Sequence, residues 1–549
     1  MNHRRFIMKK SLLNGFSIRK GVFIPLAAIY VVVIILGLVS PDAFASAENA
    51  VVGFAAGWFG WLYQIITIVL IIICVWVLVS KKVGGIRIGG ENAKPIMSKW
   101  NWFAISLCGG IATGIVFWGI AEPITHFMDG IPGLVEGGGT RMSALYALST
   151  CYMHWGLPLY AYYAAAGLLI GVCVYNLGQP YNVSSSLYPI LGEKTKGGFG
   201  SFIDLLCVFG IAGGVSASLG VASMQLGSGI GLLAKFTPTS THWLIIMAAI
   251  VATFIISSYT GINHGVRWLS DKNAKIYIGL LVYVFFFAQT KEVLAMSTES
   301  MGFFAQNWII QDTYLGVMAD GTETAMWPTW WTINYWSFMI AYTPLIGMFL
   351  AKIAQGRTLR EFSLYNFILP GVFGMIWFAI FGSASIYMQA NGAGIYEEMN
   401  EKGLEATVFA FFSNLPLSTV LSIIFMITVF LSVVTLCDSM TTTISSITLN
   451  GDTATKEPPS SIKVVWGVIM ASLAFINIAV AGITGNSSGI NATKLLAITC
   501  AFPLLFVVVA MAGSAFKLLF NYQKNYGKME EENCLANQPD YDPVAEAKE

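Results

Sequence analysis

Long apolar runs separated by short polar or charged connections make up most of the sequence. A run of about 20 apolar residues forms a helix long enough to cross a bilayer. On this pattern we predict twelve membrane-spanning helices, at residues 22–40, 60–80, 101–121, 143–175, 202–233, 242–260, 274–291, 329–354, 367–389, 417–449, 462–482 and 495–520. Several of these runs are longer than a bilayer requires, which indicates tilted helices or helices that extend beyond the membrane.

The basic residues orient these spans. Of the 30 Lys and Arg residues, only Arg141, Lys235, Lys291, Lys402 and Lys494 lie in the connections that we place outside. Lys and Arg are enriched in cytoplasmic connections. The distribution therefore predicts a multi-pass protein of the cytoplasmic membrane with both termini in the cytoplasm. The basic N-terminus leads into an apolar run without a small-residue cleavage site, so we expect an uncleaved first span.

Composition and motifs exclude several classes of protein. With 56% hydrophobic and 11% charged residues, the chain is not a soluble protein. The eight cysteines show no CxxC or Cys/His spacing, so neither a disulfide framework nor a metal site is expected. We found no phosphate-binding motif, nucleophile–base pair or repeated selectivity loop, which argues against an ATP-driven pump, an enzyme and a channel. We expect no cofactor and no nucleic-acid partner.

Two outer connections and the C-terminal tail are long enough to carry structure. Residues 293–328 contain the apolar stripe Phe303, Phe304, Trp308, Ile309 and Ile310, which predicts a helix in the outer membrane interface. Residues 389–416 are acidic and glycine-rich, and we expect a surface loop. The tail from Asn521 is polar with both charge signs, and we expect it to be disordered or weakly helical.

The third span contains three glycines, Gly109, Gly110 and Gly114, and ends at Glu122 and Pro123. A glycine costs a helix about 1 kcal/mol relative to alanine, so these positions need a reason. One reason is close helix packing through small residues. The other is an unwound segment whose backbone groups face a ligand. We interpret Glu122 as a structural partner for a nearby donor, with an outer gate as the alternative.

The eighth span begins with an aromatic stripe. Trp331, Tyr335, Phe338 and Tyr342 follow the spacing that places side chains on one face of a helix, and Pro344 can kink or break that helix. Aromatic ring faces attract ammonium groups, so the stripe suits a cationic ligand. The alternative is a packing seam combined with an interfacial aromatic belt.

Two further spans carry polar or aromatic side chains that packing alone does not require. In the fourth span, the helical repeat places Tyr162 on nearly the same face as Trp155, although Gly156 and Pro158 weaken this estimate. In the tenth span, Asp438 lies within an otherwise apolar helix. An intramembrane carboxylate is costly and is a functional candidate. Its alternative role is a hydrogen bond between helices or near a cytoplasmic cavity.

At these residues the chain resembles the betaine/choline/carnitine transporter family. Residues 331–339, Trp-Thr-Ile-Asn-Tyr-Trp-Ser-Phe-Met, match the family signature of the eighth span through Trp336 and depart from it at Phe338 and Met339. Similar family motifs are found at Gly110–Gly114 with Glu122-Pro123, at His154-Trp155 with Tyr163, and at Cys437-Asp438-Ser439. The resemblance covers residues 20–520 in order.

The resemblance implies an all-α integral membrane protein with inverted five-helix repeats of the leucine-transporter type, preceded by two extra helices. The domains would be residues 1–21, a cytoplasmic N-terminus; 22–100, two peripheral helices; 101–292, the first repeat; 293–328, an external loop with an interfacial helix; 329–520, the second repeat; and 521–549, a cytoplasmic tail. The family also implies a homotrimer in the lipid bilayer, with the interfacial helix contributing to its contact.

The resemblance further implies secondary transport by alternating access of a small zwitterion such as glycine betaine, carnitine or a less methylated relative. Carried over by position, the substrate residues are Trp155, Tyr160, Tyr163, Phe338 and Met339 in an aromatic box, Trp331, Tyr335 and Tyr342 along its path, and the backbone of Gly110, Ala112, Thr113 and Gly114 for the carboxylate. Met339 offers a thioether where the family has a ring, which leaves the degree of methylation open. A carrier of unmethylated amino acids is the alternative.

The sequence leaves open whether an ion drives transport. Sodium-coupled relatives use hydroxyls at two adjacent positions of the tenth span, but here Thr435 is followed by Leu436. A hard cation needs several oxygen ligands, so we expect one sodium site or none, with exchange as another form of transport. The candidate ion or coupling residues are Cys108, Ile111, Thr435, Asp438 and Lys275. Lys275 is either a fixed positive surrogate for the ion or an ordinary basic residue at the inner interface.

Overall fold

The computed structural model describes residues 15–260, 262–319, 323–451, 453, 456–484, 489–539 and 541, with side chains described except at 108–113, 257–270, 323 and 481–494. Helices make up most of this part of the chain. The only strands within it are β1 (Ser17–Ile18) and β2 (Leu449–Asn450), which pair antiparallel.

Most predicted spans correspond to one long helix. These are α2 (Lys20–Val39), α3 (Pro41–Val79), α5 (Lys99–Asp129), α9 (Gly198–Ala234), α10 (Ser240–Thr260), α11 (Ile262–Phe287), α14 (Asn334–Ile353), α16 (Leu369–Ala390), α19 (Ser418–Ile447), α20 (Ser460–Thr484) and α21 (Gly489–Leu519). The fourth predicted span is divided into α6 (Arg141–Trp155), α7 (Leu157–Gly171) and the π-helix η1 (Val172–Asn176).

Shorter helices connect or extend the long ones. They are α4 (Lys81–Gly84), η2 (Val183–Leu187), α8 (Tyr188–Leu191), η3 (Gly192–Lys196), α12 (Thr290–Asp312), α13 (Glu323–Pro328), η4 (Thr329–Ile333), α15 (Leu359–Ser363), η5 (Leu364–Ile368), α17 (Ile395–Lys402), η6 (Leu404–Ala406), α18 (Thr407–Ser413), α22 (Tyr522–Asn533) and η7 (Leu535–Asn537).

The lengths and apolar composition of the helices are those of a multi-pass membrane protein. Within the described residues, nine helices are long and apolar enough to cross a bilayer, or ten if α11 and α12, which are bent by 108° at their junction, form one span. The all-α membrane class that the sequence predicts is therefore confirmed. The count of twelve spans stays a prediction.

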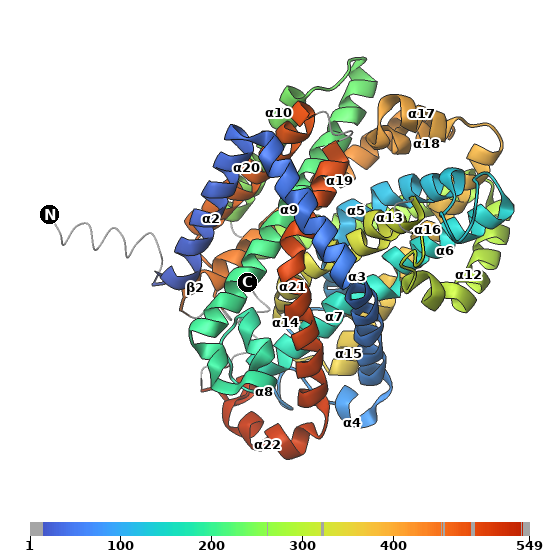
Figure 1. Ribbon diagram of the computed structural model, residues 1–549. Coiled ribbons are helices and arrows are strands. Elements are labelled where there is room, and N and C mark those ends of the chain that lie inside the picture. The colour runs from blue at the N-terminus through green and yellow to red at the C-terminus, as the bar shows by residue number, and fades with distance from the viewer. Residues whose placement is uncertain are drawn as a thin grey trace.

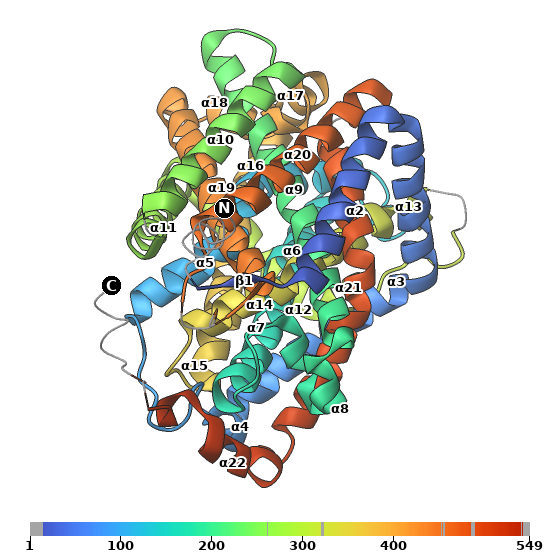
Figure 2. The same ribbon diagram turned by 90° about the vertical axis from the view of Figure 1, so that its left-hand side faces the viewer.

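The long helices lie side by side in one bundle (Figures 1 and 2). In both views α4, α8 and α22 gather at one end, whereas α10, α17 and α18 lie at the opposite end. Near the centre, α14 packs against α7 and α21, while α5 packs against α6, α16 and α19. The helices that carry the candidate residues of the fourth and eighth spans are thus direct neighbours, which places those residues inside the bundle.

The helix predicted in the external connection is present as α12. It runs at 108° to the apolar part of α11, the direction expected of a helix that does not continue through the bilayer. Leu294, Ile309 and Ile310 are exposed on it. The helix itself is confirmed, whereas its place in the membrane interface stays a prediction.

The surface loop predicted at residues 389–416 is wrong. Two short helices, α17 and α18, occupy this stretch, and α18 buries Val408, Phe409, Phe411 and Phe412. Its phenylalanine rings lie against Phe381 of α16 and Phe425 of α19. Burial of these apolar side chains stabilises the segment despite its glycines and acidic residues.

The tail is more ordered than the sequence suggested. The side-chain amide of Asn176 donates to Glu530 Oε1 of α22 at 2.7 Å, and the backbone N–H of Ala536 donates to the carbonyl of Gly89 at 3.0 Å. The backbone N–H of Lys94 donates to the Tyr541 hydroxyl at 3.0 Å. The tail therefore docks on connections of its own chain as far as Tyr541.

Candidate functional site

A break between α6 and α7 positions the aromatic residues of the fourth predicted span. Helix α6 ends at Trp155, Gly156 adopts a non-helical conformation (φ −95°, ψ −139°), and Pro158 lies in the first turn of α7. Across this break, Tyr162 turns toward α3, where its hydroxyl lies 2.7 Å from that of Thr67. The prediction that Tyr162 shares a face with Trp155 is therefore wrong, because the helix is not continuous.

Trp155 packs directly on the glycine-rich helix α5. A Cβ atom added to Gly114 would lie 2.7 Å from Cη2 of Trp155, so only glycine leaves room for this ring. Helix α5 is continuous over Lys99–Asp129, which differs from the unwound segment considered from the sequence. At Gly114 the structure supports the alternative of close packing, which offsets the cost of a glycine in a helix.

An aromatic cluster surrounds Trp155. Its ring centroid lies 5.2 Å from that of Tyr335 and 5.7 Å from that of Phe378, on which it stacks. Trp118 of α5 lies 5.9 Å from Tyr335 and 6.1 Å from Trp331 of η4. The N-terminal half of the predicted stripe, Trp331 and Tyr335, therefore faces α5 and α6.

The C-terminal half of the stripe, Phe338 and Tyr342, forms a second aromatic group. Phe338 stacks on Tyr342 with 5.4 Å between centroids, and the Tyr342 hydroxyl lies 2.9 Å from that of Ser218 in α9. The Tyr163 hydroxyl of α7 donates to the sulfur of Met339 at 3.1 Å. Tyr160 is buried on the same helix. The structure thus brings the predicted substrate residues of α7 and α14 together in the buried interior.

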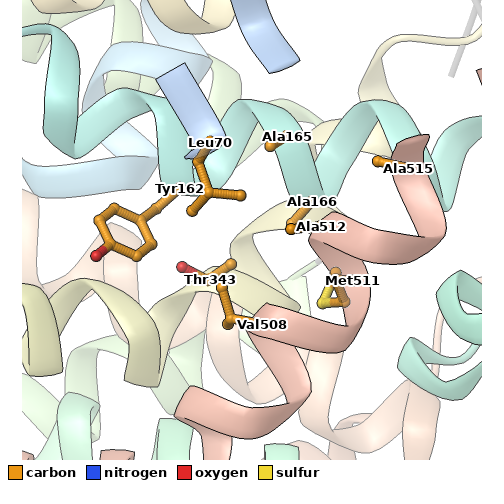
Figure 3. A pocket seen from close by; sticks show the side chains of 9 residues that line it. All are labelled: Leu70, Tyr162, Ala165, Ala166, Thr343, Val508, Met511, Ala512 and Ala515. Carbon is orange, nitrogen blue, oxygen red and sulfur yellow. The ribbon is translucent and has the colours of Figure 1, made fainter. Parts of the chain in front are cut away.

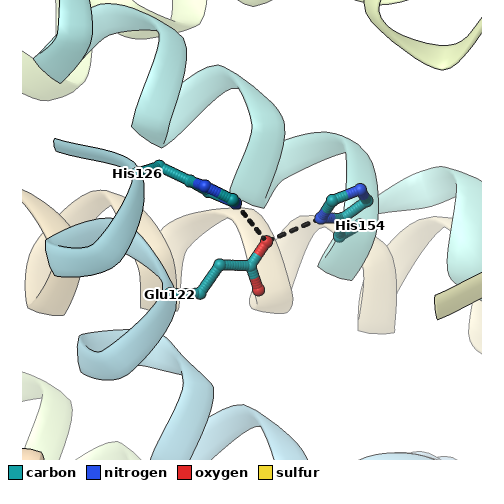
Figure 4. A group of neighbouring side chains, drawn as sticks. All are labelled: Glu122, His126 and His154. Atoms are coloured by element: carbon teal, nitrogen blue, oxygen red, sulfur yellow. Dashed lines mark hydrogen bonds and ion pairs between the residues drawn. The ribbon is translucent and has the colours of Figure 1, made fainter. Parts of the chain in front are cut away.

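Glu122 links the aromatic residues around Trp155 through hydrogen bonds. Its Oε2 atom accepts from Nε1 of Trp155 at 2.6 Å and from the Tyr335 hydroxyl at 2.7 Å. Its Oε1 atom lies 2.6 Å from Nδ1 of His154 and 3.5 Å from Nε2 of His126 (Figure 4). Glu122 itself has no solvent exposure. The interpretation of Glu122 as a partner for nearby donors is confirmed.

Sequence reasoning missed the roles of His126 and Thr332. Nε2 of His154 lies 3.1 Å from the Thr332 hydroxyl, and the His126 ring lies 4.3 Å from that of Trp331. The spacing of His126 four residues after Glu122 places both on one helical face, a signal that was available from the sequence. The approach of His154 to Glu122 depends on the packing of α6 on α5.

Glu122, His126 and His154 offer ligand atoms within 4.8 Å of one another, close enough to consider a metal ion. Tetrahedral zinc with bonds of about 2.0–2.2 Å would hold its ligand atoms roughly 3.3 Å apart. The 2.6 Å separation between Glu122 Oε1 and His154 Nδ1 is instead that of a hydrogen bond. This arrangement fits a shared proton better than a metal.

Of the candidate coupling residues, Thr435, Asp438 and Lys275 have described side chains. The Thr435 hydroxyl donates to the Leu431 carbonyl at 2.8 Å, and Asp438 is buried in α19. Nζ of Lys275 lies 2.8 Å from Oδ2 of Asp271, with the lysine side chain 56% exposed, which supports an ordinary interfacial lysine. Cys108, Gly110, Ile111, Ala112 and Thr113 belong to α5, but their side chains lie outside the described residues.

A narrow apolar cavity lies between α3, α7, α14 and α21 (Figure 3). It is lined by Leu70, Tyr162, Ala165, Ala166, Thr343, Val508, Met511, Ala512 and Ala515. The Tyr162 hydroxyl is paired with Thr67, and the Thr343 hydroxyl donates to the Met339 carbonyl at 2.7 Å. None of the predicted substrate residues lines this cavity, and its polar atoms are engaged, so we interpret it as a packing void.

Comparison with known proteins identifies relatives over most of the chain. Residues 21–524 match the family model described as betaine/carnitine/choline family transporter. A protein named probable glycine betaine transporter from Desulfitobacterium hafniense is 29% identical over 499 residues, covering 90% of this chain and 96% of that protein.

Two further relatives are similar over comparable lengths. A betaine/ectoine transporter from Corynebacterium glutamicum is 31% identical over 500 residues, covering 91% of this chain and 77% of that protein. A glycine betaine transporter from Bacillus subtilis is 29% identical over 512 residues, covering 93% of this chain and 96% of that protein. These relatives are named as transporters rather than enzymes.

Proposed function

Because the chain belongs to the betaine/carnitine/choline transporter family, we propose that it is a secondary active transporter of a betaine-type zwitterion. The substrate class is glycine betaine, carnitine or a related compact zwitterion with a methylated or delocalised cationic end. The names of the three relatives support betaine, and one of them adds ectoine, whose positive charge is delocalised.

The observation that carries this proposal is the packing of buried side chains of α6 and α7 against α14, where Trp155 lies on Tyr335 and Tyr163 on Met339. Trp155, Tyr160, Tyr163, Phe338 and Met339 would surround the cationic end, and Trp331, Tyr335 and Tyr342 would line its path. Ring faces attract a poorly hydrated cation by about 0.5–2 kcal/mol each, and Met339 adds a polarizable sulfur. All of these residues except Trp331 and Phe338 are at most 4% exposed, so the proposed site is closed to solvent in this conformation.

For the carboxylate end, we propose the face of α5 at Gly110, Ala112, Thr113 and Gly114. The backbone N–H groups of a continuous helix are engaged within it, so they would bind the carboxylate only if α5 opens during transport. Opening at glycines is the least costly, because glycine adopts non-helical conformations freely.

We propose that the helices are organised as the family implies. Helices α2 and α3 are peripheral, residues 101–292 form the first five-helix repeat, and residues 329–520 form the inverted second one. Alternating access moves the first two helices of each repeat, α5 with α6–α7 and α14 with α16, against the others around the aromatic site. The apolar residues exposed on α12 would contribute to a homotrimer contact.

Uptake into proteoliposomes tests the proposal. We expect purified protein to accumulate or exchange at least one of labelled glycine betaine, carnitine, choline, ectoine, dimethylglycine and sarcosine. Parallel assays with and without sodium decide whether sodium drives uptake. Absence of uptake and binding across the panel contradicts the substrate class. Preferential uptake of glycine and other unmethylated amino acids would favour the alternative carrier instead.

A further inference from the structure

Two imidazoles and one carboxylate meet in the interior beside the proposed substrate site. Glu122, His126 and His154 come from α5 and α6 and are at most 1% exposed (Figure 4). A buried ionised carboxylate is costly unless it is paired and hydrogen-bonded. A cluster of three titratable groups at this position therefore needs a role beyond packing, since apolar side chains would fill the same space at lower cost.

The hydrogen bonds distinguish the two histidines. His154 is held on both sides, by Glu122 Oε1 at 2.6 Å and by the Thr332 hydroxyl at 3.1 Å. Its Nδ1–H donates to the carboxylate, and a hydroxyl at Nε2 can either donate or accept. His126 is held less tightly: its Nε2 atom lies 3.5 Å from Glu122 Oε1 and, within the described residues, has no hydrogen bond.

The charge of the cluster depends on one proton. With Glu122 ionised and both imidazoles neutral, the cluster carries one negative charge. A proton taken up by the neutral His126 ring makes the cluster neutral and converts the 3.5 Å approach of Nε2 to Glu122 Oε1 into a charged pair. Other titratable groups that face Glu122 are Cys151 of α6 and Tyr335 of α14. Phe378 of α16 reaches this region through the Trp155 ring and does not titrate.

The same carboxylate holds two residues of the proposed substrate site. Glu122 Oε2 accepts from Trp155 and Tyr335, so the charge of the Glu122–His126–His154 cluster acts directly on the proposed substrate site. We propose that His126, with Glu122 as its counter-ion and His154 as its fixed partner, is a proton-binding site whose occupation opposes binding of the substrate's cationic end. This inference rests on the proposed function. It makes the protein a carrier in which proton release accompanies substrate binding.

Ligand-free protein tests the proton site without reference to substrate. Acid–base difference infrared spectra are recorded between about pH 5 and pH 9, a range that includes the charge change of an imidazole. We expect wild type to show an imidazole titration that His126→Gln lacks. His242→Gln is the control, because His242 lies in the first turn of α10 and contacts Thr239. Identical difference spectra for wild type and His126→Gln overturn the proposal whatever the substrate.

Binding measurements test the coupling. We expect the dissociation constant of glycine betaine to rise at least about fivefold from pH 8 to pH 5.5 in wild type and His242→Gln, and to be flat in His126→Gln. Mixing substrate with weakly buffered wild type should release protons. Binding that is independent of pH, or tighter at low pH, overturns the coupling. If no substrate of the panel binds at any pH, the proposed function fails, while the infrared result still decides the proton site.

Elemental analysis separates a proton from a metal. The purified protein is incubated with zinc chloride, desalted and analysed by mass spectrometry. We expect less than one tightly held zinc per chain and no change in His126→Gln. One zinc per chain that is lost in His126→Gln would overturn the proton assignment in favour of a metal site.

Discussion

At the scale of single residues, Trp155 owes its position to two contacts that belong to different parts of the chain. Gly114 leaves room for its ring, and Glu122 accepts its N–H at 2.6 Å. The sequence identified Trp155 and Glu122 separately, and it anticipated that Glu122 pairs with a donor. It could not identify the donors, because an apolar helix face does not specify which neighbouring helix covers it.

Phe338 is the residue where a single change should alter affinity in either direction. It is only partly buried, so a larger ring is tolerated there, whereas Met339 is fully enclosed. Because indole gives the strongest cation–π attraction, we expect Phe338→Trp to bind glycine betaine more tightly, and Phe338→Ala more weakly, each by roughly 2- to 30-fold. Isothermal titration with purified variants measures both. Unchanged affinity in both variants would remove Phe338 from the site.

At the scale of elements, the sequence predicted which segments are helical but not how they break. The apolar runs overlap the long helices, although α3 and α11 begin well before the predicted spans 60–80 and 274–291. The hydrophobic pattern did not predict two features: the non-helical Gly156, which redirects Tyr162 toward α3, and the burial of α18. Both depend on tertiary contacts. Hydrophobic periodicity assumes one continuous helix, so it does not predict the break at Gly156. Acidic residues and glycines indicate a loop in the sequence, although the phenylalanines of the same segment are buried against neighbouring helices.

Gly114 tests the packing of α5 against α6. A methyl group there would press on the Trp155 ring at 2.7 Å, so we expect Gly114→Ala to displace the ring, lower the thermal midpoint and weaken substrate binding. Gly279 in α11 is the matched control, since a Cβ there meets nothing within 4 Å. Gly279→Ala should be neutral or slightly stabilising. Equal stability and affinity in the two variants would show that the Gly114 contact is unimportant.

At the scale of the whole molecule, the chain belongs to the betaine/carnitine/choline transporter family. Family membership over residues 21–524 agrees with the resemblance that the motifs indicated. The repeats, the trimer and the orientation of the termini stay proposals. The pattern of basic residues predicts the orientation of the termini. The repeats and the trimer can be predicted only through relatives, because hydropathy and charge define neither the pairing of the spans nor their contacts.

Cysteine labelling tests the orientation. Met318, which is 95% exposed in the connection after α12, is expected outside, and Lys194, exposed before α9, is expected inside. In intact cells, a membrane-impermeant maleimide should label Met318→Cys and should label Lys194→Cys only after permeabilisation. Wild type controls for background, since its cysteines within the described residues are buried. The reverse labelling would invert the topology.

The most direct test of the central claim is the affinity of wild type and Trp155→Ala for a methylation series. Binding of glycine, sarcosine, dimethylglycine and glycine betaine is measured by titration under one set of conditions. A cationic site lined by aromatic rings predicts that the methylated zwitterions bind wild type more tightly than glycine does. It also predicts that Trp155→Ala removes most of this difference. Tightest binding of glycine, or an unchanged difference in Trp155→Ala, would contradict the account.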